Sequence, residues 1–161
     1  MKMTELQELL RSGNHSLVVA KTEVNTYDGR GVSDLFRLLH DEPEALHGAL
    51  LADKVVGKGA AALMVVAKAA EVYAEVISQP ALDMLLKAGI VATYGQLVEH
   101  IINCDATDMC PLEKRCMACR TAEECIPEIT AFIEEMKAKH ASSSTRQLVN
   151  SSTKIKCRQQ Q

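Results

Sequence analysis

Aromatic side chains and long apolar stretches are what this sequence most lacks. Only 3% of its 161 residues are aromatic, and tryptophan is absent. A surface that stacks nucleic-acid bases needs aromatic rings. The 18 basic and 21 acidic residues also leave a net charge of −3, so both features argue against a nucleic-acid-binding protein. No uncharged run approaches the roughly 18 apolar residues of a membrane span, and residues 1–6 lack a signal peptide's apolar segment. We therefore expect a cytoplasmic protein without a membrane span.

Cysteine, by contrast, is unusually concentrated. The chain has six cysteines, and five of them fall between positions 104 and 125. In a reducing compartment such clustering favours metal binding or redox chemistry over structural disulfides.

The apolar pattern predicts alternating strands and helices after residue 49, which indicates an α/β domain built on a parallel sheet. We expect an α/β core over residues 1–103, then a cysteine-rich segment and a C-terminal helix over 104–140. Residues 141–161 carry four basic and no acidic residues; they are either a disordered solubilising tail or an anion-binding arm. The expected helices are 4–12, 33–40, 54–68, 80–88, 95–102 and 127–140, and the expected strands are 17–22, 24–27, 49–52, 72–77 and 90–94.

One candidate site lies where the strand expected at 49–52 gives way to a helix. Asp53 is expected to cap this helix. Lys54 and Lys58, four residues apart, share a helix face, and with the free amides around Gly57 they form a candidate site for a phosphate or carboxylate. Asp53 is then a candidate general base. The structural alternative is that Asp53 only caps the helix and that the lysines extend to solvent over apolar surface.

The same region resembles a known family. The resemblance rests on ADKVVGKGAAA at 52–62, SQPAL at 78–82 and CPLE at 110–113, and it covers about residues 15–115. These motifs resemble those of a bacterial domain-of-unknown-function family with a cytidine-deaminase-like fold. The resemblance implies a three-layer α/β/α fold around a mixed sheet, and it implies no established activity. The candidate ligand-binding residues are Lys54, Gly57, Ser78, Asn103 and Glu113.

The residues of a deaminase zinc site are missing. Zinc deaminases carry H-x-E at one helix start and P-C-x-x-C at the next. The corresponding positions here, 53–55 and 79–83, hold no histidine, no glutamate and no cysteine pair. Zinc with an open coordination position needs three protein ligands, so we do not expect zinc-dependent deamination. Ser78 is expected to be a helix cap rather than a nucleophile.

The cysteine spacing from position 104 is C-x5-C-x5-C-x2-C-x5-C. The C-x2-C pair Cys116 and Cys119 can direct two sulfurs at one ion, and Cys110 and Cys125 complete a four-thiolate site. An iron–sulfur cluster and zinc both fit, and the single C-x2-C slightly favours the cluster. Reactive thiols and inert cysteines are the alternatives.

Cys110 has a second interpretation. It precedes a predicted helix, and thiolates at helix N-termini have lowered pKa values. Cys110 is therefore also a candidate nucleophile, with Glu113 or His100 as its neighbour.

Two functions follow from these patterns. The first is an enzyme or a binding protein for a small anionic or nucleotide-like ligand, with Asp53, Lys58 and Cys110 as candidate catalytic residues. The second is a non-enzymatic redox or metal-dependent accessory module that docks on a partner protein.

Overall fold

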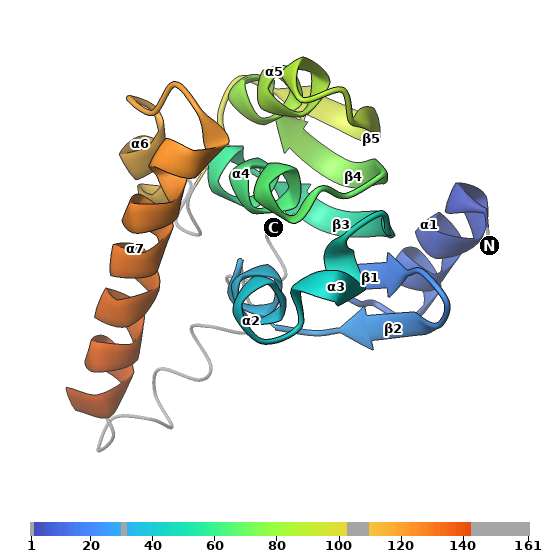
Figure 1. Ribbon diagram of the computed structural model, residues 1–161, viewed down its shortest axis with the longest axis horizontal. Helices are drawn as coiled ribbons and strands as arrows, with labels where there is room; N and C mark the ends of the chain where they lie inside the picture. Colours follow the sequence, from blue (N-terminus) through green and yellow to red (C-terminus); the bar gives the residue numbers. More distant parts are fainter. Residues whose placement is uncertain (1, 30–31, 103–109, 143–161) are drawn as a thin grey trace.

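A mixed five-stranded sheet organises the chain in the computed structural model, which describes residues 2–29, 32–102 and 110–142. The strand order is β2-β1-β3-β4-β5 (Figure 1). β1 pairs antiparallel with β2 and with β3, whereas β3, β4 and β5 run parallel. The mixed α/β sheet expected from the sequence is therefore confirmed. The strands are β1 Leu17–Ala20, β2 Val24–Tyr27, β3 Leu50–Val56, β4 Glu71–Ser78 and β5 Val91–Val98.

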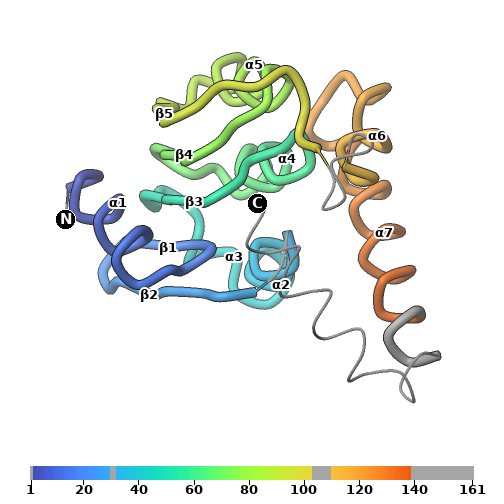
Figure 2. The backbone as a smooth tube through the Cα atoms, turned by 180° about the vertical axis from the view of Figure 1, so that it is seen from behind, coloured from blue at the N-terminus to red at the C-terminus, as the bar shows by residue number. Residues whose placement is uncertain are grey.

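Helices cover both faces of this sheet. On one face α1 packs against β1 and β3, and on the other α4 packs against α2, α5, α6 and α7 (Figures 1 and 2). Each layer has its own apolar cluster, the larger one around α4 and the smaller one under α1. The arrangement agrees with the expected three-layer α/β/α fold. The helices are α1 Met3–Ser12, α2 Ser33–Asp41, α3 Pro43–Leu46, α4 Lys58–Ala67, α5 Gln79–Lys87, α6 Pro111–Cys116 and α7 Ala122–Ser142.

α4 lies at the centre of the helical layer. Seven of its ten residues are buried, including Gly59, Leu63 and Met64. A helix that is apolar all round needs neighbours on every side, and α4 has them. Within the described residues, none of the helices combines the length and the apolarity needed to cross a membrane.

The predicted helix start at Lys54 is wrong. β3 continues through Lys54 to Val56, and α4 begins only at Lys58, with the extended residue Gly57 as its N-cap. Parallel pairing decides this boundary, because Val55 and Val56 are held in register with Val76 and Ile77 of β4.

The predicted helix over 95–102 is wrong as well. β5 runs on to Val98, because its second half stays paired with β4 as far as Ser78. Local sequence favoured a helix there, and tertiary pairing overrode that preference.

The C-terminal helix begins five residues before the predicted start at Pro127. The side chains of Thr121 and Glu124 accept hydrogen bonds from backbone amides at the start of this helix. Glu124 N donates to Thr121 Oγ1 at 3.2 Å, and Arg120 N donates to Glu124 Oε2 at 2.6 Å. The T-x-x-E spacing at residues 121–124 is that of a capping box, so the sequence itself indicates this helix start.

Candidate functional site

Glu113 is the buried polar centre of the region where β3 and β4 end. Its side chain is only 2% exposed. Oε1 accepts hydrogen bonds from the Lys58 amide at 2.7 Å and from the Ser78 hydroxyl at 2.9 Å, and Oε2 accepts one from the Ile101 amide. The carboxyl group of α6 therefore joins the first residues of α4, the cap of α5 and the segment after β5.

This contact changes the prediction of an anion site at the start of α4. Free amides at a helix N-terminus attract anions, but here the carboxyl group of Glu113 already accepts from Lys58 N. The protein's own carboxyl group therefore occupies this helix end. An external phosphate or carboxylate that binds the Lys58 amide would first have to displace Glu113 from this hydrogen bond.

Two glycines leave room for α6 to come this close. A Cβ atom on Gly57 would lie 3.3 Å from Glu113 Oε1, and one on Gly59 would lie 2.8 Å from Leu112 Cδ2. The second distance is shorter than real Cβ contacts allow. The G-K-G and C-P-L-E motifs are thus two halves of one packing contact.

Lys58 also connects α4 to the end of α6. Its Nζ donates to the backbone oxygens of Met117 at 3.1 Å and of Cys119 at 2.6 Å. Both carbonyls lie just beyond α6, where a cation is favourable. Lys54 does not share a helix face with Lys58, as the sequence predicted, because Lys54 belongs to β3.

Asp53 lies in the middle of β3 and does not cap a helix. It pairs with Leu17 of β1 and Ala74 of β4, and it is 7% exposed. Burial raises the pKa of Asp53 to about 8, although the amides of Val55 and Lys54 oppose the rise. The side chain is therefore a buried, protonated carboxyl group at neutral pH, and Glu113, not Asp53, lies at the start of α4.

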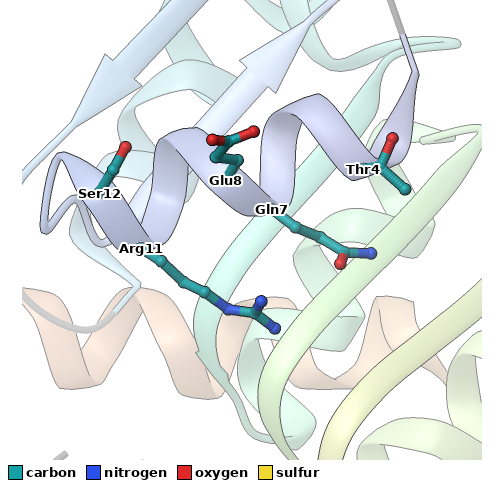
Figure 3. A pocket seen from close by; sticks show the side chains of 5 residues that line it. All are labelled: Thr4, Gln7, Glu8, Arg11 and Ser12. Carbon is teal, nitrogen blue, oxygen red and sulfur yellow. The ribbon is translucent and has the colours of Figure 1, made fainter.

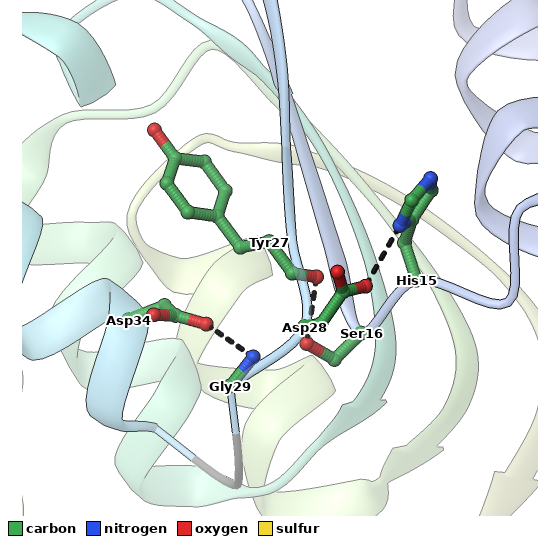
Figure 4. Close-up of polar contacts among 6 residues, drawn as sticks. All are labelled: His15, Ser16, Tyr27, Asp28, Gly29 and Asp34. Atoms are coloured by element: carbon green, nitrogen blue, oxygen red, sulfur yellow. Dashed lines mark hydrogen bonds and ion pairs between the residues drawn. The ribbon is translucent and has the colours of Figure 1, made fainter.

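The loop beside this part of the sheet is held by its own polar contacts (Figure 4). His15 Nδ1 and Asp28 Oδ1 are 2.7 Å apart, and Gly29 N donates to Asp34 Oδ2 at 2.7 Å. Asp34 adds a small rise to the pKa of Asp53. These contacts join the end of β2 to the segment before β1 and to the first turn of α2.

Ser78 is the helix cap that the sequence predicted. Its Oγ accepts from Ala81 N at 3.4 Å at the start of α5 and donates to Glu113. A hydroxyl held in both directions is structural, which agrees with the expectation that Ser78 is not a nucleophile.

Three of the predicted metal ligands come together at the turn between α6 and α7. Cys116 and Cys125 are fully buried, and Cys119 is half-buried. The Cys125 thiol lies close enough to those of Cys116 and Cys119 to interact electrostatically with both. We call these three residues the thiol cluster. Among the described residues, no group of three histidine, cysteine, aspartate or glutamate side chains is arranged to hold a metal ion.

The thiol cluster is electrostatically unfavourable for thiolates. Burial raises the pKa of the Cys119 thiol to about 11, and contact with Cys125 adds to the rise, whereas nearby Lys58 lowers it. Contact with Cys116, together with burial, raises the pKa of Cys125. Cys119 and Cys125 therefore stay protonated at neutral pH unless a cation or oxidation removes their protons.

Cys110 stands apart from this arrangement. It is half-buried at the N-cap position of α6, makes no side-chain capping bond, and donates its amide to the Ile101 oxygen at 2.7 Å. Its thiol is not among the groups that shift the pKa of Cys119 or Cys125. Asn103, Cys104 and Cys157 lie outside the described residues.

A groove of about 1050 Å³ opens beyond the carboxyl end of β5. One wall runs along the whole length of α5. The others are the end of β5 with His100 and the turn before α7 with Cys119, and Lys58 lies on the α4 side. His100 Nδ1 is buried and has no hydrogen-bond partner within residues 2–29, 32–102 and 110–142. Sequence analysis named His100 only as a neighbour of Cys110 and did not predict the groove, because its walls come from four separate segments. The other residues that line it are Val65, Gln79, Pro80, Asp83, Met84, Lys87, Ala88, Leu97, Val98, Glu99, Arg120, Thr121, Ala122 and Glu123.

A second, shallower depression of about 500 Å³ follows the outer face of α1 (Figure 3). Its only basic residue, Arg11, is already bonded to Glu75 at 2.7 Å and to the Tyr73 hydroxyl at 2.8 Å. All the side chains that line this depression come from α1, and its one basic group is already hydrogen-bonded. It is therefore a weaker candidate for a ligand-binding site than the groove.

Comparison with known proteins gives a family but no activity. The family described as "Domain of unknown function (DUF1893)" matches residues 5–135. The chain is also similar to the crystal structure of a DUF1893 family protein, TM1506, from Thermotoga maritima. The two share 25% sequence identity with a TM-score of 0.74, over 80% of this chain and 88% of that chain. A comparison with curated proteins found no match. The expected domain-of-unknown-function family is thus confirmed, and its cytidine-deaminase-like character is not.

Proposed function

The chain belongs to the DUF1893 family, which carries no stated activity, and we propose from its own site that it binds a small polar molecule in the groove between α5, the end of β5 and the turn before α7. Buried polar atoms in native proteins nearly always have a partner. His100 carries this proposal, because it lines the groove and its buried Nδ1 has no partner among the described residues. A rotation of the imidazole ring toward the groove would let a donor or acceptor on a bound molecule satisfy this nitrogen.

The position of the groove supports the same function. In open α/β sheets, ligands bind outside the carboxyl ends of parallel strands, and this groove lies beside the ends of β4 and β5. Its size is at the upper end of the range for small-molecule pockets, roughly 300–1,000 Å³.

The charges in the wall limit the ligand class. Lys58, Lys87 and Arg120 are balanced by three carboxylates, those of Asp83, Glu99 and Glu123. Such a wall suits a molecule with one anionic group, such as a nucleoside monophosphate. It also suits a molecule that carries both a positive and a negative group, such as an amino-acid derivative. It disfavours a polyanion, because the carboxylates would repel it.

A thermal-shift screen of the reduced, full-length protein tests this proposal. The panel contains nucleosides, nucleoside monophosphates, sugar phosphates and amino acids. We expect at least one class to raise the melting temperature and to slow alkylation of Cys119, which lines the same groove. His100→Ala should lose most of this shift, whereas His47→Ala, an exposed histidine before β3, should keep it.

Specific results of this screen would contradict ligand binding in the groove. If no compound shifts the wild-type protein, or if His100→Ala responds as fully as wild type, the groove is not the binding site. A shift without protection of Cys119 places the compound elsewhere on the surface.

The contacts of the thiol cluster favour a second candidate function, reversible disulfide formation. Cys125 interacts electrostatically with both Cys116 and Cys119, so we expect either pair to be able to lose two electrons and two protons to a low-molecular-weight disulfide, which is reduced to two thiols. This would make the chain the redox-dependent accessory module considered from the sequence, with redox state controlling its docking on a partner protein.

The predicted iron–sulfur or zinc site remains a proposal for the same cysteines. Soft thiolate donors suit both groups, and a bound cation would remove the thiol protons that the cluster otherwise keeps. Cys110 would have to approach the other three to complete four ligands. Anaerobic purification, a visible spectrum, and iron, sulfide and zinc assays decide this. A colourless, metal-free protein with freely titratable thiols would contradict the metal site, and reversible disulfide formation would then be the remaining function proposed for these cysteines.

A further inference from the structure

β5 is an unusually open edge of the sheet. It is an end strand of eight residues, Val91–Val98, and none of them is charged or proline. Six of the eight are exposed. No strand pairs with its outer side within residues 2–29, 32–102 and 110–142. Such an edge presents a row of backbone donors and acceptors that a further strand can pair with.

Exposed apolar side chains concentrate around this strand. Among the described residues seven large hydrophobic side chains are exposed, and five of them lie on α5, on β5 or just after it. Single exposed apolar side chains scattered over a surface need no explanation, but a group of them beside an open sheet edge indicates an interaction surface. The five residues are Leu86, Val91, Tyr94, Leu97 and Ile102.

The opposite edge of the sheet lacks these properties. β2 has only four residues, and the hairpin turn before it contains Lys21 and Glu23 while Asp28 follows it. Short strands and flanking charges are how natural proteins protect an edge against pairing. β5 is twice as long as β2, and Glu99, just after its end, is its flanking charge. The long uncharged edge is therefore a feature of β5 and not of β2.

We propose that β5 pairs antiparallel with β5 of a second copy of this chain about a two-fold axis, so that two sheets join into one of ten strands. An antiparallel neighbour satisfies the edge backbone groups of both copies at once. Because the strand carries no charge, every register sets uncharged residues opposite each other.

One register uses the sequence of the strand particularly well. With the axis at Tyr94, the Tyr94 side chains of the two copies lie opposite each other on one face of the joined sheet. On the other face, Val91 of each copy lies opposite Leu97 of the other, so the exposed apolar side chains of the strand pair with one another. A foreign strand could use the backbone edge, but only a second copy offers this self-complementary set.

Mass measurement by multi-angle light scattering tests the proposal on the full-length, reduced protein at micromolar concentration. A monomer has a mass of 17.6 kDa, and we expect twice that value for the wild type. Thr93→Lys, an exposed position of β5, sets like charges near each other across the axis and should return the mass to that of the monomer. The matched control is Thr26→Lys on the other edge strand, also exposed, which should remain a dimer.

Circular dichroism and the melting temperature establish that both variants fold. In hydrogen exchange, the edge-facing amides of β5 should be protected in the wild type and exchange at least ten times faster in Thr93→Lys. A wild-type protein that stays at the monomer mass overturns the proposal. So does a folded Thr93→Lys variant that keeps the dimer mass.

Discussion

Glu113 Oε1 lies 2.7 Å from the amide nitrogen of Lys58, although 55 residues separate the two in sequence. This hydrogen bond joins the C-P-L-E segment to the G-K-G helix start. The same oxygen accepts from Ser78 at 2.9 Å. The three family motifs are therefore parts of one buried polar contact, and their common role is first of all structural.

Glu113→Gln should destabilise the protein. An amide can accept with its oxygen only, so its NH₂ group would face at least one of the three donors at Lys58, Ser78 and Ile101. Leaving a buried donor unsatisfied costs about 1–3 kcal/mol, and more for charged partners, so we expect a loss of about 3 kcal/mol. Urea unfolding measures it, with Glu134→Gln on the exposed side of α7 as the control. Equal midpoints for the two variants would show that the contact is dispensable.

Gly59→Ala should destabilise the protein by overpacking. The new Cβ would lie 2.8 Å from Leu112 Cδ2, and overpacked cores typically lose about 1–3 kcal/mol. The intrinsic helix preference for alanine over glycine acts in the opposite direction by up to about 1 kcal/mol. Leu112→Ala removes the clashing methyl groups, so in the Leu112→Ala background Gly59→Ala should be neutral or stabilising. Additive losses in this double-mutant cycle would contradict the packing argument.

Asp53 should make stability fall as pH rises. Its folded pKa of about 8 exceeds its unfolded value near 3.8, so between these two pH values the folded state holds a proton that the unfolded state has released. The free energy of unfolding then decreases with pH across this window and levels off above about pH 8. One pKa unit corresponds to about 1.4 kcal/mol, so the slope is measurable.

Asp53→Asn removes the titrating group while it keeps the size of the side chain. We expect this variant to gain stability relative to wild type as pH rises from 5 to 8, with little further gain above pH 8. Denaturant unfolding at several pH values checks it, and Asp83→Asn on exposed α5 is the control. A constant difference between Asp53→Asn and wild type would place the carboxyl group in contact with water.

Cys119 should be the first thiol of the cluster to react, but slowly at neutral pH. It is half-buried, whereas Cys116 and Cys125 are fully buried. Only the thiolate attacks iodoacetamide, so with a pKa of about 11 the rate should rise about tenfold per pH unit between pH 7 and 10. Peptide mapping by mass spectrometry follows each cysteine. Fast labelling at pH 7, or labelling of Cys125 before Cys119, would refute the arrangement described.

Sequence patterns alone predicted the outline of the fold because those signals are local. The hairpin of β1 and β2, the helices α1, α2 and α5, and the parallel alternation from residue 49 all follow from apolar periodicity and cap residues. Ser78 was recognised as a cap because a serine before Gln-Pro has few other local roles. The concentration of cysteines predicted that Cys116, Cys119 and Cys125 would lie together, since few residues separate them.

Tertiary structure decided what depends on distant partners. Asp53 looks like a cap beside Lys54, yet pairing with β1 and β4 keeps it inside a strand. Glu113 looks like an ordinary residue of a short helix until α6 packs on α4 and gives it three donors. The scarcity of aromatic residues in the sequence argues against a base-stacking surface, and this stays a prediction. The groove around His100 and the open edge of β5 required the fold, because a wall made of separate segments, or a strand without a neighbour, exists only after the sheet has assembled.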